Sequence, residues 1–182
     1  MSKKLFIFVG PSASGKTTIE NELIRRYKFK RLVQSTSRVI RPMEEDSVDY
    51  YFRSTKECLE LDNATEIHIS EDWVYSLQES EIKDKFEGCD NILYSCINSE
   101  PALELEKYIK ENEIAEVKII LFNIDIDERI KLLKARGDSM EDIKVRLGRE
   151  ENLKLSVLNF DLEINNLESS FRNISRFIEL GN

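Results

Sequence analysis

The stretch Gly10-Pro11-Ser12-Ala13-Ser14-Gly15-Lys16-Thr17 follows an apolar run, Leu5–Val9, and precedes an amphipathic segment that extends to Tyr27. It fits the pattern G-x-x-x-x-G-K-[ST], in which a glycine-rich loop joins a buried strand to a helix. Such a loop exposes successive backbone N–H groups to phosphate oxygens, and the positive end of the helix dipole favours the same anion. The stretch therefore predicts a phosphate loop, and with it an α/β fold of the P-loop NTPase type.

The loop residues have separate expected roles. We expect the ammonium group of Lys16 to reach the β- and γ-phosphates of ATP, and the hydroxyl of Thr17 to be a ligand of Mg²⁺. The alternative is a glycine-rich turn without a ligand, and the motif says nothing about a second substrate. The full set of predicted ATP-binding residues is Gly10, Pro11, Ser12, Ala13, Ser14, Gly15, Lys16, Thr17 and Thr18.

Composition restricts the class of protein. The chain has 182 residues, of which 41% are hydrophobic and 34% are charged, which suits one globular domain. No stretch reaches the apolar length of a membrane helix, and the net charge of −8 argues against nucleic acid as the main partner. Three cysteines without a CxxC pair favour a reducing cytoplasm. We therefore expect a cytoplasmic protein that does not bind nucleic acid or membranes.

Charge is unevenly distributed along the chain. Residues 1–42 contain ten Lys and Arg side chains against two Glu, so this part is strongly basic within an acidic protein. A basic segment of this kind suits a compact anion such as phosphate, although a solvated helix end and loop would have the same composition.

Strand-like and helix-like patterns alternate, which predicts a central parallel sheet between layers of helices, a three-layer sandwich. The predicted strands are Leu5–Val9, Arg31–Thr36, Thr65–Ile69, Trp73–Leu77, Asn91–Ile97, Val117–Asn123 and Leu162–Asn165. The predicted helices are Thr17–Tyr27, a short one opened by a capping box at residues 54–57, Glu100–Asn112, Asp127–Arg136, a long one from Ser139 toward Asn159, and Leu167–Leu180.

A second motif lies at residues 34–52, Gln-Ser-Thr-Ser-Arg-Val-Ile-Arg-Pro-Met-Glu-Glu-Asp-Ser-Val-Asp-Tyr-Tyr-Phe. Together with the phosphate loop it resembles the guanylate kinase family, whose pattern is close to S-x-T-T-R-x-x-R-x-G-E-x-x-G-x-D-Y-x-F at this distance from the loop. The positions in register are Thr36, Arg38, Arg41, Glu44, Asp49, Tyr50 and Phe52. The likeness extends over nearly the whole chain and is clearest before Phe52.

The resemblance implies a nucleoside monophosphate kinase with a core, a monophosphate-binding region and a helical lid. By matched position, Arg38, Arg41 and Tyr50 would hold the phosphate of the acceptor. Two guanidinium groups and a phenol suit a phosphate dianion, although two surface arginines would look the same in a sequence. Gln34 stands where the family has a serine and is included in the expected acceptor site.

Further along the chain the match is looser. Glu66 and Tyr75 have the spacing of the family's base-reading glutamate and phosphate-binding tyrosine, but Glu66 could equally be an exposed strand residue. Arg136 and Arg146 resemble lid residues that would neutralise charge on the transferring phosphoryl group, with Arg149 one helical turn away. The alternative for the lid arginines is a charged helix surface, with pairing to Glu150 or Asp142.

The chain departs from the family pattern at several positions. Met43 and Ser47 replace glycines, and Ser76-Leu77 stands where Gly-Thr or Gly-Ser is usual. The largest departure is the strand that begins at Asn91, because Tyr94 and Cys96 occupy the positions of two acids, near the guanine and the metal waters. These changes put in question how the base is read and how the metal is supported, and Cys96 is expected to be a buried small residue.

The leading prediction is an ATP-dependent phosphotransferase that converts ATP and GMP to ADP and GDP, with Mg²⁺ as cofactor. Its expected catalytic residues are Lys16, Arg38, Arg136 and Arg146. The alternatives are a related kinase acting on another nucleotide or a sugar phosphate, and a guanylate kinase-like binding module without catalysis. We expect one domain, a monomer or homodimer, with core segments 1–33, 91–135 and 150–182, a monophosphate-binding region at about 34–90 and a lid at about 136–149.

Overall fold

A computed structural model of the chain describes residues 2–42, 44–70, 73–150 and 153–181, and the side chains of Glu66, Ser70 and Arg149 lie outside this description. Met43, one of the departures noted above, is also outside it.

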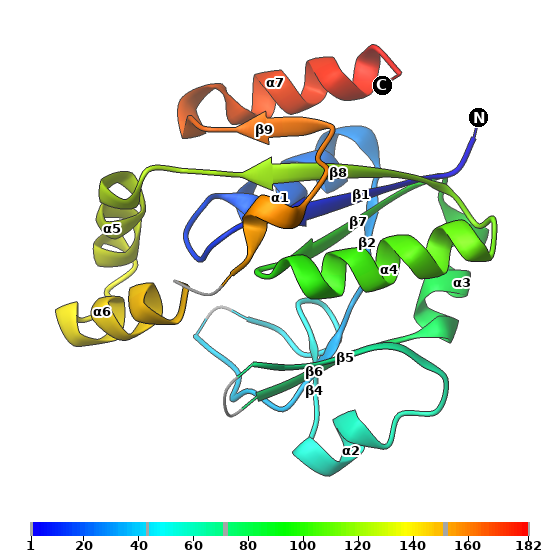
Figure 1. Cartoon of the computed structure of the whole chain (residues 1–182), viewed down its shortest axis with the longest axis horizontal. Coiled ribbons are helices and arrows are strands. Elements are labelled where there is room, and N and C mark those ends of the chain that lie inside the picture. The colour runs from blue at the N-terminus through cyan, green and yellow to red at the C-terminus, as the bar shows by residue number, and fades with distance from the viewer. Residues whose placement is uncertain (1, 43, 71–72, 151–152, 182) are drawn as a thin grey trace. The chain divides into compact units, whose positions relative to one another are not determined.

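A five-stranded parallel sheet, in the order β2-β7-β1-β8-β9, forms the centre of the fold (Figure 1). Every residue of β1 from Leu5 onward is buried, as expected of a strand covered on both faces. The predicted α/β fold with a central parallel sheet is confirmed. The strands of this sheet are β1 (Lys4–Val9), β2 (Lys30–Arg31), β7 (Asn91–Cys96), β8 (Glu116–Phe122) and β9 (Leu162–Ile164).

Helices flank the sheet, and side-chain caps begin several of them. Asp125 caps α5, Asn166 caps α7, and capping boxes begin α2 at Ser54 and α6 at Ser139. The helices are α1 (Lys16–Tyr27), α2 (Thr55–Leu59), α3 (Glu79–Gly88), α4 (Ser99–Glu111), α5 (Ile126–Ala135), α6 (Met140–Arg149) and α7 (Leu167–Glu179), with a 3-10 turn, η2 (Leu155–Val157).

A smaller sheet, in the order β4-β3-β6-β5, comes from the middle of the chain. It consists of β3 (Ser35–Thr36), β4 (Tyr51–Phe52), β5 (Ala64–Ser70) and β6 (Trp73–Gln78). Thr36 pairs with Phe52 on one side and with Tyr75 on the other. This pairing brings the motif at residues 34–52 beside the strand that contains Tyr75.

Three predictions of secondary structure were wrong. The predicted strand Arg31–Thr36 is two short strands in different sheets, because Val33 between them donates its N–H to the Glu81 carboxylate at 2.9 Å instead of to a strand. Helix α3 was missed, although Ile82 and Phe86 are buried one turn apart. The helix predicted to run toward Asn159 ends at Arg149, with Glu150 as its C-cap.

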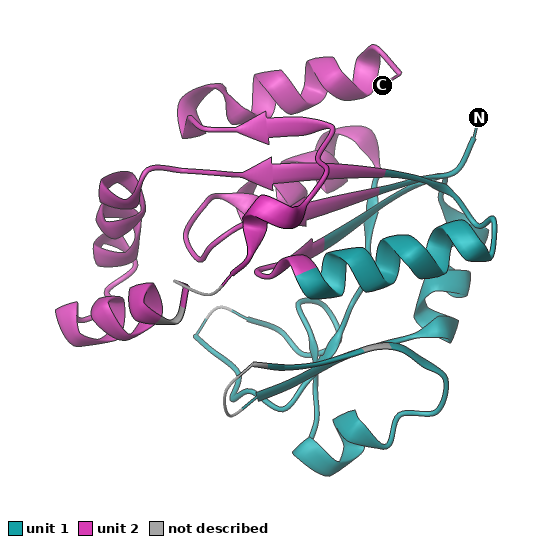
Figure 2. Cartoon of the chain, viewed as in Figure 1, with its two compact units in different colours: residues 1–5, 29–94, 100–117 teal, residues 6–28, 95–99, 118–182 magenta. Residues whose placement is uncertain are grey.

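The chain divides into two compact units, which Figure 2 distinguishes by colour. The first contains residues 1–5, 29–94 and 100–117, with the whole smaller sheet. The second contains residues 6–28, 95–99 and 118–182, with the phosphate loop and α5 to α7. The predicted candidate residues are therefore described below unit by unit.

Candidate active site

The phosphate loop (Gly10–Thr17) joins β1 to α1, as predicted. Gly10 cannot be replaced without rearrangement, since a Cβ there would meet the Phe122 carbonyl oxygen at 2.5 Å. Gly15 is the N-cap of α1 and has φ 87°, in the left-handed region that favours glycine. The start of the loop is further attached to β7, because the Gly10 N–H donates to the Cys96 carbonyl at 3.3 Å.

The Lys16 side chain folds back and forms hydrogen bonds with its own loop. Its Nζ donates to the carbonyl oxygens of Gly10 and Pro11 at 2.6 and 2.8 Å, and to Ser14 Oγ at 3.2 Å. Burial lowers the pKa of Lys16 to about 8, and the nearby charge of Arg129 acts in the same direction, whereas Glu20 and Glu150 oppose it. The ammonium form still predominates at neutral pH, so Lys16 offers a positive charge to an incoming phosphate.

Thr17 and Thr18 lie in the first turn of α1, and both are exposed. A threonine hydroxyl is an oxygen donor of the kind that Mg²⁺ accepts. Among the residues that the structure describes, no group of three or more His, Cys, Asp or Glu side chains is placed to hold a metal ion.

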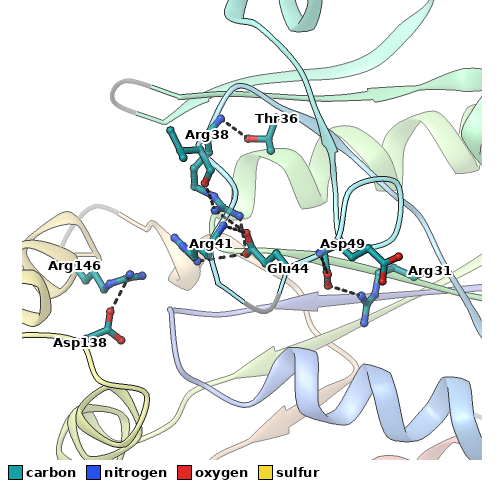
Figure 3. A network of polar contacts seen from close by, with 10 residues as sticks. Arg31, Thr36, Arg38, Arg41, Glu44, Asp49, Asp138 and Arg146 are labelled. Carbon is teal, nitrogen blue, oxygen red and sulfur yellow. Dashed lines mark hydrogen bonds and ion pairs between the residues drawn. The ribbon is translucent and has the colours of Figure 1, made fainter.

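The acceptor region (Gln34, Arg38, Arg41, Tyr50 and Tyr75, with Glu44) belongs to the first unit. Arg38 is 7% exposed, and its guanidinium forms a two-pronged pair with Glu44, at 3.0 Å from Nη1 to Oε2 and 2.8 Å from Nη2 to Oε1 (Figure 3). Arg41 donates its backbone N–H to Glu44 at 2.9 Å, and its Nη1 lies 4.0 Å from the same carboxylate. Glu44 therefore organises both arginines.

Charge and aromatic rings stabilise this arrangement. Burial works against the charge on Arg38, but the hydrogen bonds and negative charge of Glu44 outweigh it and raise the pKa of Arg38. Burial alone would raise the pKa of Glu44, but the hydrogen bonds from Arg38 and Arg41 hold it below its usual value. The Arg38 guanidinium also lies over the Tyr50 ring at 5.2 Å, and the Tyr50 and Tyr75 rings are 6.1 Å apart.

Two positions at which the chain departs from the family pattern contact each other. The Gln34 amide nitrogen donates to the Tyr94 hydroxyl at 2.8 Å. Gln34 is 7% exposed and Tyr94 is completely buried. Tyr94 is thus an interior residue whose polar end is bonded to Gln34. Cys96 is also buried, as expected, and its thiol donates to the Asn98 carbonyl at 3.3 Å.

The remaining predicted residues are more dispersed. Glu66 pairs with Leu77 through its backbone in β5, but its side chain is outside the described part of the structure. Arg136 is exposed at the C-cap of α5. Arg146 in α6 donates to Asp138 Oδ1 at 3.1 Å, rather than to either of the partners suggested by helical spacing. The Arg149 side chain, like that of Glu66, is not described.

Sequence reasoning missed several polar groups around the phosphate loop. Glu20 is 2% exposed and accepts from Ser95 Oγ at 2.6 Å. Arg129 and Glu150 are both nearly buried and contact Ser12. The contacts of Glu20 with Ser95 and of Arg129 and Glu150 with Ser12 span 75 to 138 residues along the chain, so no local spacing could have indicated them.

A parallel sheet with flanking helices and a phosphate loop between β1 and α1 defines a P-loop kinase fold. A family model described as "Guanylate kinase" matches residues 2–180. Guanylate kinases of Streptococcus thermophilus and Streptococcus pyogenes are 28% and 29% identical over 96% of this chain, covering 85% and 84% of their own lengths. The guanylate kinase of Desulfotalea psychrophila is 27% identical over 90% of this chain and 81% of its own length.

The comparison with solved structures agrees with the sequence comparisons. A crystal structure of guanylate kinase from Anaplasma phagocytophilum has a TM-score of 0.68, covers 99% of this chain and 86% of its own, and is 19% identical. The chain belongs to the guanylate kinase family, and the class of protein predicted from the two motifs is confirmed. It is accordingly an ATP-dependent nucleoside monophosphate kinase of the guanylate kinase type. No helix in the described part of the chain is long and apolar enough to cross a membrane.

Proposed function

We propose that this protein transfers the γ-phosphoryl group of ATP to the phosphate of a nucleoside monophosphate, with GMP as the first candidate. The observation that supports this acceptor class is the cluster of Arg38, Arg41, Tyr50 and Tyr75, with Glu44 holding the arginines in place. Guanidinium groups and phenol hydroxyls are hydrogen-bond donors suited to a phosphate dianion. The guanylate kinases at 27–29% identity favour GMP within that class.

Residue roles follow from the chemistry of phosphoryl transfer, in which positioning and charge stabilisation do most of the work. Backbone N–H groups of the phosphate loop would bind the ATP phosphates, and Lys16 would neutralise charge on the β- and γ-phosphates. Arg38 would align the acceptor, while Arg136 and Arg146 would neutralise the phosphoryl group in transit. Arg146 would have to exchange its bond to Asp138 for this.

Mg²⁺ is the metal we propose, with the Thr17 hydroxyl as its protein ligand. When bound, it would neutralise charge on the phosphates of ATP. We also propose a cytoplasmic location, a monomer or homodimer, no nucleic-acid partner, and the division into core, monophosphate-binding region and lid given above.

A second candidate keeps the reaction but changes the acceptor to another nucleotide or a sugar phosphate. The buried Gln34–Tyr94 hydrogen bond favours it, because an amide and a phenol occupy positions where the family pattern has a serine and an acid. A guanine reader needs groups that accept hydrogen bonds from the base, and a Tyr94 hydroxyl already bonded to Gln34 offers less than a carboxylate.

The test is an ADP-release assay with ATP and Mg²⁺, in which GMP, dGMP, AMP, CMP, UMP and ribose bisphosphate are compared as acceptors. ADP release with GMP or dGMP alone is the expected result. Release with another acceptor would support the second candidate. If no acceptor raises ADP above the level of Lys16→Ala while ATP still binds, the proposal is wrong for this set and a binding module becomes the better description.

A further inference from the structure

Two charged side chains hold the backbone of Ser12, one at its N–H and the other at its carbonyl group. The Ser12 N–H donates to Glu150 Oε1 at 2.8 Å, and Arg129 Nε donates to the Ser12 carbonyl oxygen at 2.9 Å. Arg129 Nη2 is also bonded to Glu150 Oε2, which closes the set of contacts. Arg129 lies near the start of α5 and Glu150 is the C-cap of α6, so two helices converge on the backbone of one residue of the phosphate loop.

The burial of this pair indicates that its role is more than a surface contact. The Arg129 and Glu150 side chains are 8% and 10% exposed. Removing two charges from water is costly, and their mutual attraction offsets this only when further hydrogen bonds satisfy the remaining polar atoms. The backbone of Ser12 supplies one such acceptor and one such donor, so the backbone conformation at Ser12 helps to offset the cost of burying the pair.

The next loop residue is held by the same two helices. Ala13 has φ 57°, a left-handed conformation that a residue with a Cβ seldom adopts. Ala13 is 7% exposed and lies in a small apolar cluster with Leu133 of α5 and Ile143 of α6. A strained residue persists where its surroundings over-determine its conformation. Polar contacts at Ser12 and apolar packing at Ala13 together provide that restraint.

We infer that Arg129 and Glu150 are positioning residues for the nucleotide: by holding the peptide groups on both sides of Ser12, they set the directions of the backbone N–H groups that receive the ATP phosphates. The inference rests on the proposed function, because it requires the loop to bind a nucleotide. It also makes α6 a support of the loop, since the end of that helix carries the acceptor for the Ser12 N–H.

A matched pair of substitutions separates positioning from charge. Glu150→Gln and Glu150→Met both remove the negative charge and leave Arg129 without its ion-pair partner, but only glutamine can still accept the Ser12 N–H. Binding of ADP with Mg²⁺ is measured by calorimetry, alongside thermal melting. We expect Met to weaken ADP binding about tenfold to a hundredfold, as a displaced binding group does, and Gln to recover most of that loss. Equal affinities for the two variants would overturn the inference.

The double variant Arg129→Glu with Glu150→Arg provides a second test. It can keep the ion pair, but Glu at 129 cannot donate to the Ser12 carbonyl and Arg at 150 cannot accept its N–H. We expect its melting temperature to stay closer to that of the wild type than its ADP affinity does. If the double variant binds ADP as tightly as the wild type does, the ion pair only stabilises the fold and does not position the loop. If the wild type itself fails to bind ADP, the proposed function fails and not the inference alone.

Discussion

The phosphate loop and the acceptor region differ in which parts of the chain they present. The loop presents backbone groups from one continuous stretch, with Lys16 as its charged side chain. The acceptor region presents side chains from residues 34–50 and from β6. Several of them already form hydrogen bonds or ring contacts within the protein. Backbone recognition depends on a local conformation that glycines permit, whereas side-chain recognition depends on which residues meet in space. The contribution of the loop is therefore set by its local conformation, and that of the acceptor region by the particular side chains that meet there.

The largest expected effect tests whether backbone groups alone suffice for nucleotide binding. Lys16→Ala should lower the turnover number about 100- to 1000-fold, since removal of one charge-stabilising group in a preorganised site costs about that much. Affinity for ADP should fall by about tenfold or less, because the loop N–H groups remain. Turnover by the ADP-release assay and affinity by calorimetry are compared with Lys107→Ala, an exposed lysine on α4. Equal loss of affinity and turnover would contradict the division of roles.

Substitutions in the acceptor region should change the KM for the acceptor more than they change the affinity for ATP. Arg38→Lys keeps a positive charge beside Glu44 but loses the planar fork, so the KM for the acceptor should rise about tenfold while the KM for ATP changes little. Steady-state kinetics with each substrate varied in turn measures both constants. Arg25→Lys, at an exposed ion pair on α1, is the control. A rise confined to the KM for ATP would place Arg38 at the other substrate.

Acid pH should weaken the acceptor region. The folded-state pKa of Glu44 is lowered, chiefly by its bonds to Arg38 and Arg41 against the effect of burial. The stabilisation is therefore fully present above the unfolded pKa of about 4.5 and is lost as pH falls through the lower folded value. Because the pair is partly exposed, its contribution should be about 1 kcal/mol.

Urea unfolding of wild type and Glu44→Gln measures that contribution. We expect the wild type to be the more stable at pH 7 and the difference to shrink near pH 3. If the wild type instead gains stability over Glu44→Gln as the pH falls, the predicted direction of the pH dependence is wrong.

The smallest effect concerns the buried amide–phenol bond. Tyr94→Phe should lower the free energy of unfolding by about 1 kcal/mol, because one buried hydrogen bond to the Gln34 amide is lost. Adding Gln34→Ser should cost less in the Tyr94→Phe background than in the wild type, giving a coupling of about 0.5–1 kcal/mol in a double-mutant cycle. Additive effects would show that the two side chains contribute independently.

The sequence predicted those features that depend on local pattern. Leu5–Val9 and the loop up to Thr17 were recognisable because apolar runs, glycines and a lysine at set spacing have a local physical cause, and the capping box at Ser54 is of the same kind. Arg38 and Tyr50 were identified through resemblance to a family, and the short distance between them follows from the pairing of β3 with β4.

Long-range polar contacts could not be predicted in this way. The bond of Glu150 to Ser12 spans 138 residues, and nothing in the spacing of either residue indicates the other. The same applies to Glu81, whose carboxylate takes the Val33 N–H and thereby divides the predicted strand Arg31–Thr36. The missed helix α3 is a different case, since Ile82 and Phe86 provided a helical period that went unused.

The hydrogen bond between Gln34 and Tyr94 links two of the positions at which this chain departs from the family pattern. Two positions that differ from the family pattern form one donor–acceptor pair in the interior, so a change at either position alters the surroundings of the other. Reverting either position alone removes this hydrogen bond from the interior, and an acid at 94 would place a charge at a completely buried site beside an amide. Changing the two positions to the family residues one at a time would therefore pass through a variant in which this buried hydrogen bond is broken, whichever position is changed first.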